Sequence, residues 1–318
     1  MTATPLRWGV LGGTSFVARR AVLPALRSSA SAVVRSVASR DGDGGYGAYE
    51  QVLRDPAIDA VYLPLPNALH REWTLRCAAA GRHVLCEKPL GVDAAEAEAM
   101  AAACARAGVV LMEAYMTPFH PRAAAVIDIA RTELGTLRSA HTAFTFPLRA
   151  GTNYRWMPEM GGGALLDVGV YCLAPLLALA GRDPVGVTAS TRRASSGVDS
   201  TTSGVLDFGA GVTASFTCSF EAEELQLIEV AGTRGTLRAE HIFTGGVDDV
   251  EITLAWADGT AETRRTAGLD PYRAMVEHFA AVVRGETVPR YDVPASLRMA
   301  RLLDAVRRAA HADPAPAR

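Results

Sequence analysis

Short apolar segments alternate with helical segments over the first 120 residues of this 318-residue chain. The apolar segments span 7–11, 33–38, 58–63, 83–86 and 109–113. Chains that alternate in this way form parallel strands joined by right-handed crossovers, with helices on both faces of the sheet. This half of the sequence therefore predicts a doubly wound parallel sheet.

A glycine turn follows the first apolar segment, and a helical pattern follows the turn. Such a turn lets backbone N–H groups and a helix N-terminus face the pyrophosphate of a dinucleotide. Only Gly12 keeps its glycine in the G-x-G-x-x-G frame, since Thr14 and Val17 hold the other two glycine positions. The turn is therefore either a degenerate dinucleotide-binding turn or an ordinary strand-to-helix turn. In the first case the residues beside the cofactor are Gly12, Thr14, Ser15 and Phe16.

The end of the second apolar segment bears on the choice of cofactor. In this fold an acidic residue there binds the ribose 2′-hydroxyl of NAD(H), whereas an arginine accommodates the 2′-phosphate of NADP(H). Ser39 and Arg40 come first, which favours NADP(H), and Asp41 keeps NAD(H) possible. The glycine-rich stretch 43–49 is short for a crossover helix. Either this helix is trimmed or a flexible loop replaces it.

Lys88 is the only lysine among the 32 lysine and arginine residues. An arginine stays charged at any working pH, whereas the pKa of a lysine can be lowered by burial, so an isolated lysine suits proton chemistry. Lys88 follows the apolar segment 83–86, and Pro89 ends that strand. Its side chain is therefore expected at a strand's carboxyl end, where open α/β sheets bind ligands. The alternative is a lysine that survives by chance in an arginine-rich sequence.

Strand candidates dominate from Thr136 onward. Residues 212–220 alternate apolar and polar side chains, which indicates an antiparallel sheet with one buried face. Further strand candidates are 140–146, 185–189, 225–230, 236–239 and 250–256, and amphipathic helices are expected at 271–284 and 294–310. A chain of this length suggests about two domains.

A helix led by three glycines begins at Gly161 and extends to about Leu179. Asp167 and Tyr171 are four residues apart, so both project from one face of this otherwise apolar helix. This pattern favours two polar groups directed into a cleft. The alternative is a buried tyrosine hydroxyl bonded to a backbone carbonyl.

Composition limits the other classes of function. A net charge of −2 gives no general attraction to nucleic acid or to an anionic membrane. We find no apolar run near the ~18 residues of a membrane span and no signal-peptide pattern, so we expect a soluble cytoplasmic protein. The five cysteines lack metal-type spacing and are expected as reduced core residues, with no metal site.

The order and spacing of these motifs resemble the Gfo/Idh/MocA family of dinucleotide-dependent oxidoreductases over nearly the whole chain. The matching segments are 9–12, 38–40, 64–67 with His70, 87–89, and 161–169 with Tyr171. Family members that act as polyol dehydrogenases typically have a histidine where this chain has Tyr171. The chain is therefore more similar to the branch of sugar ketoreductases, dihydrodiol dehydrogenases, aldose dehydrogenases and glucose–fructose oxidoreductase.

The resemblance implies an N-terminal Rossmann domain, 1–120, that binds NADP(H). It also implies a C-terminal α+β domain, 121–318, whose large, mostly antiparallel open sheet serves substrate binding and oligomerisation. The family's E-K-P lysine falls on Lys88, and its catalytic-helix aspartate falls on Asp167. The expected cofactor-binding residues are Gly12, Thr14, Ser15, Phe16, Ser39, Arg40, Leu65, Pro66, Asn67, His70, Glu87 and Lys88. The expected substrate-binding residues are Lys88, His120, Arg155, Asp167 and Tyr171.

The expected activity is hydride transfer between nicotinamide and a sugar or sugar-like carbonyl or secondary alcohol. We expect Tyr171 to act as the acid in the reductive direction, with Lys88 making its hydroxyl more acidic and Asp167 orienting a substrate hydroxyl or Lys88. A rival mechanism makes Lys88 the acid. Alternative functions are a trans-dihydrodiol dehydrogenase and a silent NADP(H)-binding sensor.

The partner of this chain is expected to be a small-molecule sugar or a nucleotide-sugar. A nucleotide-sugar needs a cationic or aromatic platform, for which the candidates are Arg149, Tyr154, Arg155 and Trp156. The second face of the sheet that contains 212–220 suggests a homo-oligomer, either a dimer or a tetramer.

Overall fold

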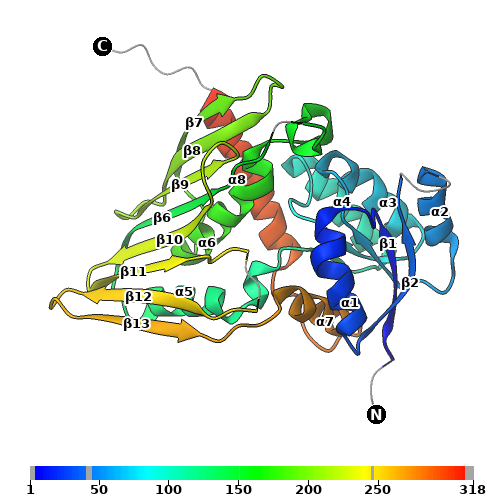
Figure 1. Cartoon of the computed structure of the whole chain (residues 1–318), viewed down its shortest axis with the longest axis horizontal. Helices are drawn as coiled ribbons and strands as arrows, with labels where there is room; N and C mark the ends of the chain where they lie inside the picture. Colours follow the sequence, from blue (N-terminus) through cyan, green and yellow to red (C-terminus); the bar gives the residue numbers. More distant parts are fainter. Residues whose placement is uncertain (1–3, 41–44, 150, 245–246, 312–318) are drawn as a thin grey trace. The chain divides into compact units, whose positions relative to one another are not determined.

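The computed structural model describes residues 4–40, 45–149, 151–244 and 247–311 (Figure 1). The chain divides into two compact units. The first unit contains Met1–Phe119 and Asp270–Ala300, and the second contains His120–Leu269 and Arg301–Arg318. Residues 270–300, which the sequence analysis placed in the second domain, therefore pack with the N-terminal part of the chain.

The first unit is built on a parallel sheet, as the alternating pattern predicted. Its strands are β1 (Leu6–Leu11), β2 (Ala32–Ala38), β3 (Ala60–Leu63), β4 (His83–Cys86) and β5 (Leu111–Glu113). They lie in the order β2-β1-β3-β4-β5, and every neighbouring pair is parallel. All four residues of β3 are buried, as expected for a strand covered on both faces.

The helices of the first unit include segments from both ends of the chain. They are η1 (Ala18–Val22), α1 (Leu23–Ser28), α2 (Tyr46–Arg54), η2 (Asn67–Leu69), α3 (His70–Ala79), α4 (Ala94–Ala107), η3 (Thr117–Phe119), α7 (Pro271–Val283) and the start of α8 (Val293–His311). Phe279 of α7 packs against Trp8 of β1 with ring centroids 5.1 Å apart, and both side chains are fully buried. This contact explains why α7 belongs to the first unit.

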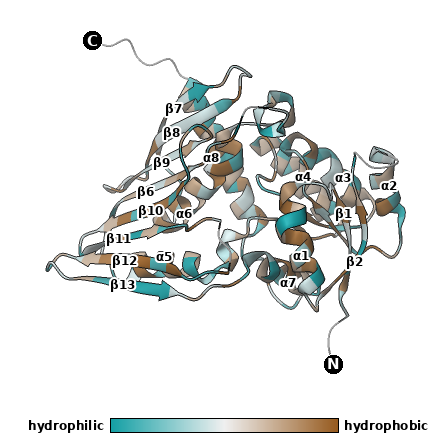
Figure 2. Cartoon of the chain, in the orientation of Figure 1, coloured by the Kyte–Doolittle hydropathy of each residue, from teal (hydrophilic) through white to brown (hydrophobic). Residues whose placement is uncertain are grey.

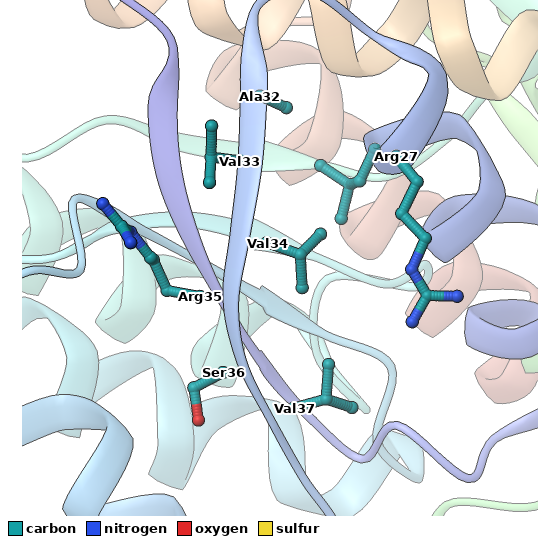
Figure 3. A pocket seen from close by; sticks show the side chains of 8 residues that line it. Arg27, Ala32, Val33, Val34, Arg35, Ser36 and Val37 are labelled. Carbon is teal, nitrogen blue, oxygen red and sulfur yellow. The ribbon is translucent and has the colours of Figure 1, made fainter.

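The connection from β2 to β3 is short. It contains the nine-residue helix α2. Of the two alternatives for this connection, a shortened helix or a flexible loop, the structure therefore has the shortened helix. β2 is an edge strand, and Arg35 is an extra residue in its pairing with β1, between Val34 and Ser36. Figure 3 shows the result: Arg35 and Ser36 project to one side of β2, whereas Val34 and Val37 project to the other. A bulge and a charged side chain are features that protect sheet edges from unwanted pairing.

The second unit contains the large, mostly antiparallel sheet that was expected. Its strands are β6 (Leu137–Thr145), β7 (Gly186–Arg193), β8 (Asp199–Asp207), β9 (Thr213–Ser219), β10 (Leu225–Gly232), β11 (Gly235–Glu240), β12 (Val250–Trp256) and β13 (Ala261–Thr266). The order is β13-β12-β11-β10-β6-β9-β8-β7, and only β6 and β9 run parallel among these strands. Figure 2 shows that the edge strand β13 is strongly hydrophilic.

Helices α5 (Pro121–Thr132) and α6 (Val170–Ala180) lie on one face of this sheet (Figure 1). Short helical turns, η4 (Tyr154–Trp156), η5 (Pro158–Met160) and η6 (Leu165–Gly169), lead into α6. Among the described residues, the stretch Pro158–Ala180 is the one helical segment long and apolar enough to cross a membrane, a length that the sequence analysis did not recognise. Because 78% of its apolar window is buried inside the protein, it has the character of a core helix.

Candidate active site

The glycine turn after β1 has a shape that glycine alone permits. Gly12 has a φ of +103°, and its N–H donates to Ala38 O at 2.8 Å. A Cβ at this position would lie 2.9 Å from Leu65 Cδ2 and 3.0 Å from Pro64 O. A Cβ at Gly13 would overlap Val37. The turn therefore brings its backbone close to the ends of β2 and β3, which leaves a cradle that any larger side chain would fill.

A helix starts directly after this cradle. Ser15 caps it, since its Oγ accepts from the N–H of Ala18 at 3.2 Å. Thr14 and Phe16 are exposed, and the Phe16 side chain is 76% accessible. Glycine cradle and helix N-terminus together fit the pyrophosphate of a dinucleotide.

Ser39 and Arg40 follow β2, and Arg40 is exposed. The N–H of Arg40 donates to the hydroxyl of Tyr49 in α2 at 3.2 Å, which fixes the backbone at the strand's end. Asp41, the residue that kept NAD(H) possible, lies outside the described residues.

The loop after β3 is tied to the loop after β4. His70 is fully buried, and its Nε2 lies 2.9 Å from Leu65 O while its Nδ1 lies 2.8 Å from Pro89 O. Burial lowers the pKa of His70, and its contacts with the backbone oppose that effect. Asn67 is also buried. His70 therefore holds the segment 64–67 and the E-K-P segment in a fixed relation.

Lys88 is half-buried and follows two buried residues, Cys86 at the end of β4 and Glu87. The neighbouring Glu87 accepts from the Tyr62 hydroxyl at 2.7 Å and from the N–H of Lys88 at 3.3 Å. Glu113 accepts from the N–H of Leu90 at 3.1 Å. The first unit thus gathers the predicted residues at the carboxyl ends of β1 to β4, where doubly wound sheets bind ligands.

The second unit contains the polar pair on the glycine-led helix. Asp167 is buried, and its Oδ2 accepts from Arg155 Nε at 2.6 Å. Burial lowers the pKa of Arg155, but the Asp167 carboxylate and its hydrogen bond outweigh that effect, and the net pKa is raised. Arg155 also lies over the Tyr154 ring, 5.0 Å from its centroid. Tyr171 is one helical turn after Asp167, with its ring edge-on to Phe144 at 5.4 Å.

Asp199 is a site-supporting residue that sequence reasoning missed. From the start of β8, its Oδ2 accepts from the N–H of Leu165 at 2.6 Å, at the beginning of the helix that carries Asp167. Gly163 has a φ of +116°, and a Cβ there would overlap Asp199 Oδ1. A Cβ at Gly162 would also collide with the backbone of Arg155. Gly162 and Gly163 are therefore needed because the start of the helix lies close to other segments at both positions.

His120, also expected at the substrate, is a buried helix cap in the structure. Its Nδ1 accepts from the N–H of Arg122 at 3.1 Å at the start of α5. Burial, followed by the charge of Arg122, lowers the pKa of His120 to about 4, which keeps the ring neutral. Lys88 belongs to the first unit, whereas His120, Arg155, Asp167 and Tyr171 belong to the second.

The described residues contain no cluster of three or more histidine, cysteine, aspartate or glutamate side chains suited to a metal ion. The five cysteines are buried and reduced.

Comparisons with known proteins decide the family. Residues 10–115 match the model described as the oxidoreductase family with an NAD-binding Rossmann fold, and residues 125–238 match the GFO/IDH/MocA C-terminal domain. The chain belongs to the Gfo/Idh/MocA family of oxidoreductases. The resemblance seen in the sequence, the fold class and the assignment as an oxidoreductase are thereby confirmed.

Three members of the Gfo/Idh/MocA family are similar to this protein over most of its length. D-xylose 1-dehydrogenase (NADP(+)) 2 of Haloferax volcanii is 38% identical, over 95% of this chain and 96% of the relative. A trans-1,2-dihydrobenzene-1,2-diol dehydrogenase of Sus scrofa is 35% identical over 72% of each chain. The crystal structure of KijD10, a 3-ketoreductase from Actinomadura kijaniata in complex with NADP and TDP-benzene, matches with a TM-score of 0.90 at 33% identity, over 96% of this chain and 98% of KijD10.

Proposed function

We propose that this protein is an NADP(H)-dependent oxidoreductase that moves a hydride between nicotinamide and the carbonyl or carbinol carbon of a sugar or sugar-like molecule. The observation that carries the proposal is the ion pair between buried Asp167 and half-buried Arg155, one helical turn before Tyr171. A partly buried charged pair beside a tyrosine is suited to orienting hydroxyl groups and to moving one proton. The relatives named for NADP(+)-dependent xylose dehydrogenation and 3-ketoreduction support the same chemistry.

The roles of the residues follow from their environments. The Gly12 cradle and the helix that Ser15 caps bind the pyrophosphate, and Arg40 with Ser39 binds the 2′-phosphate. When bound, the nicotinamide supplies or accepts the hydride. Tyr171 donates the proton to the carbonyl oxygen in the reductive direction, and Lys88 holds that oxygen with its ammonium group. Asp167 accepts a hydrogen bond from Arg155, which holds its carboxyl in place, and it orients a substrate hydroxyl.

A Tyr171→Phe variant tests the acid role. Proton transfer by a placed side chain contributes about 10²–10⁴-fold, so kcat should fall by that factor, which corresponds to about 3–5 kcal/mol in the barrier. NADPH affinity should be unchanged, since Tyr171 is in the second unit. Tyr46→Phe, which removes a hydroxyl from an exposed tyrosine of the first unit, is the matched control and should keep kcat. A retained rate with an unchanged basic limb of the pH profile would assign the proton to Lys88.

The contacts of Arg155 and Trp156 favour a free sugar over a nucleotide-linked one. The Arg155 guanidinium is committed to Asp167, and the Trp156 indole N–H donates to Arg149 O at 3.0 Å. The Trp156 ring also packs edge-on to Phe220, with centroids 5.4 Å apart. Two members of the cationic and aromatic platform that a nucleotide diphosphate needs are thus engaged within the protein. We infer that unactivated aldoses, or polyols of similar size, are the substrates.

The reduction of a nucleotide-linked keto-sugar is the second candidate, which the likeness to KijD10 favours. A panel should compare NADP⁺ reduction by free aldoses with NADPH oxidation by TDP-linked keto-sugars, and trans-dihydrodiols should be included. Arg155→Met separates the two candidates. If Arg155 serves Asp167, the variant loses activity on every substrate, whereas a diphosphate-binding Arg155 would be needed only for nucleotide-linked substrates. Cofactor binding without turnover on any member of the panel would indicate a sensor.

We also propose that the protein is a cytoplasmic homo-oligomer, a dimer or tetramer, in which the large sheet pairs subunits. Exposed side chains such as Thr236, Arg238 and Thr253 alternate with buried ones along β11 and β12, which gives this sheet a second, accessible face. A monomeric mass by light scattering at micromolar concentration would refute the assembly. We further propose that residues 1–119 with 270–300 form the NADP(H)-binding domain and that the second unit binds the substrate.

A further inference from the structure

Two buried carboxyl side chains lie at the ends of neighbouring strands behind Lys88. Glu113 is the last residue of β5, where it pairs in register with Cys86 of β4, and Glu87 follows Cys86. Glu113 is 2% exposed and Glu87 is 7% exposed. Two carboxyl groups this deeply buried are costly to ionise together, because burial and mutual repulsion both penalise the second negative charge.

Glu87 has partners for both of its oxygens. Its Oε1 accepts from the hydroxyl of Tyr62 at 2.7 Å, and its Oε2 accepts from the N–H of Lys88 at 3.3 Å. Burial raises the pKa of Tyr62 well above its ordinary value, and the charge of Glu87 adds to this effect, so the phenol remains a donor. Glu87 is therefore placed to hold a negative charge.

Glu113 is bound on one side only. Its Oε1 accepts from the N–H of Leu90 at 3.1 Å, and the carboxyl is hydrogen-bonded to the Ser296 hydroxyl in α8. Its Oε2 is buried and has no hydrogen-bond partner among the described residues. Burial raises the pKa of Glu113 to about 7, with Glu87 acting in the same direction, whereas Ser296, the N–H of Leu90 and Lys88 oppose it.

The groups around this carboxyl come from three segments of the first unit. Glu87 and Lys88 after β4, and Tyr291 and Ser296 around the start of α8, interact with Glu113 directly, whereas Tyr115 after β5, Asp292 and Arg298 interact with Tyr291. Tyr115 and Tyr291 pack edge-on with ring centroids 5.1 Å apart, and burial raises the pKa of Tyr291 well above its ordinary value. Among the groups that face Glu113, the Lys88 ammonium is the one linked to the proposed chemistry.

We propose that Glu113 is a positioning residue for Lys88, and that the protonation state of its carboxyl sets how Lys88 is held. The protonated carboxyl connects Leu90 to the start of α8 without adding charge, so that Glu87, which accepts from the backbone N–H of Lys88, is the buried anion beside this segment. The ionised carboxyl adds a second anion and draws the ammonium back toward the strand ends. Lys88 then gives less stabilisation to a substrate oxygen. This inference rests on the proposed function through the role of Lys88.

The unique lysine makes a direct experiment available. Protein grown with lysine labelled with ¹⁵N at Nζ gives a single side-chain lysine signal, whose chemical shift can be followed from pH 5.5 to 8.5. We expect an inflection near pH 7 in the wild-type protein. Glu113→Gln, which keeps an amide oxygen for the N–H of Leu90 but does not titrate, should abolish the inflection. Glu277→Gln, which removes an exposed glutamate of α7, is the matched control and should keep it.

Activity provides a second readout. Below pH 6, the wild type and Glu113→Gln should have the same kcat. Above pH 8, the kcat of the wild type should be about tenfold lower than that of Glu113→Gln. Glu113→Ala, which removes the partner of Leu90 and of Ser296, should lose kcat about tenfold at every pH. An inflection that persists in Glu113→Gln would overturn the coupling. The coupling would also be overturned if Glu113→Gln lost as much kcat as Glu113→Ala and kept the pH profile of the wild type. Since the resonance is read without turnover, its outcome is independent of whether the proposed sugar chemistry is correct.

Discussion

Replacement of Asp199 by alanine should loosen the start of the helix that carries Asp167 and Tyr171. The Asp199 carboxylate accepts from the N–H of Leu165 at 2.6 Å and from the Thr202 hydroxyl at 3.3 Å. Loss of a helix cap typically costs 0.5–2 kcal/mol, and a buried donor left without a partner costs about 1–3 kcal/mol. Both figures describe the same hydrogen bond, so we expect about 2 kcal/mol of lost stability. For a unit of this size that is roughly 4–8 °C in Tm.

Urea unfolding and calorimetry of Asp199→Ala measure this loss, with Asp199→Asn as the matched control. The asparagine keeps an oxygen acceptor for Leu165 and should cost less than half as much. Since the helix start also sets the Asp167–Arg155 contact, kcat of the alanine variant should fall about tenfold while NADPH affinity, a property of the first unit, is unchanged. An alanine variant within 0.5 kcal/mol of the wild type would refute the capping argument.

The pH dependence of the Asp199→Asn control has a defined sign. Burial raises the pKa of Asp199, and the hydrogen bonds from Leu165 and Thr202 only partly offset it. A carboxyl with a raised folded-state pKa contributes its stability below the unfolded pKa, and that contribution is lost as pH rises through the folded pKa. Wild type should therefore exceed Asp199→Asn in stability by more at pH 4 than at pH 8.

Three further predictions concern the first unit. Arg40→Ala should weaken NADPH binding about ten- to hundredfold more than NADH binding, as measured by cofactor fluorescence, and equal losses would show that the arginine does not bind the 2′-phosphate. Gly12→Ala should abolish binding of both cofactors, because the residue has a φ of +103° and its Cβ would meet Leu65 and Pro64; retained affinity in isothermal titration would contradict the cradle. The pKa of Glu113 is about 7 in the folded protein, against an ordinary value of 4.5. As pH rises from 4.5 through 7, the wild type should therefore lose on the order of 3 kcal/mol of unfolding free energy relative to Glu113→Gln, as measured by urea titrations. Parallel stability curves for the two proteins would show that the carboxyl does not titrate there.

The parallel sheet was predictable because its central strands are buried on both faces. β3 and β4 appear in the sequence as unbroken apolar runs, and that signal does not depend on distant residues. The alternation of β9 was equally visible, and the structure places Thr213–Ser219 beside β6. Lys88 stood out because it is the only lysine of the chain, and Asp167 and Tyr171 because they are polar groups on an otherwise apolar helix.

Strands β8 and β13 were not recognised, because their sequences lack apolar alternation. Ser200 and Thr202 of β8 are buried as hydroxyls, and the Thr202 hydroxyl bonds to Thr191 of β7 at 2.9 Å. β13 is an edge strand whose Arg264 pairs with Glu133 at 2.7 Å. The hydrogen bonds and ion pairs that stabilise such strands come from segments far away in the sequence. No local pattern indicates them.

The same reason explains the missed site features. An amphipathic helix shows which of its faces is buried but not which sheet covers it, so α7 could not be assigned to Trp8 from its sequence. Asp199 precedes a polar strand, and its contact with Leu165 exists only once β8 lies beside the helix start. Glu113 was visible as a glutamate at a strand end, but its burial depends on Ser296 and Tyr291.

In the proposed cofactor site, the short connection after β2 bears on how Arg40 is placed to bind the 2′-phosphate. The described part of this connection contains one short helix, α2. The N–H of Arg40 is held by the Tyr49 hydroxyl, and Tyr49 packs edge-on against Trp73 of α3 with centroids 4.9 Å apart. Tyr46 packs on the same two rings. In the proposed cofactor site, selectivity for NADP(H) would therefore depend on an aromatic cluster that fixes the backbone of one exposed arginine at the end of the edge strand β2.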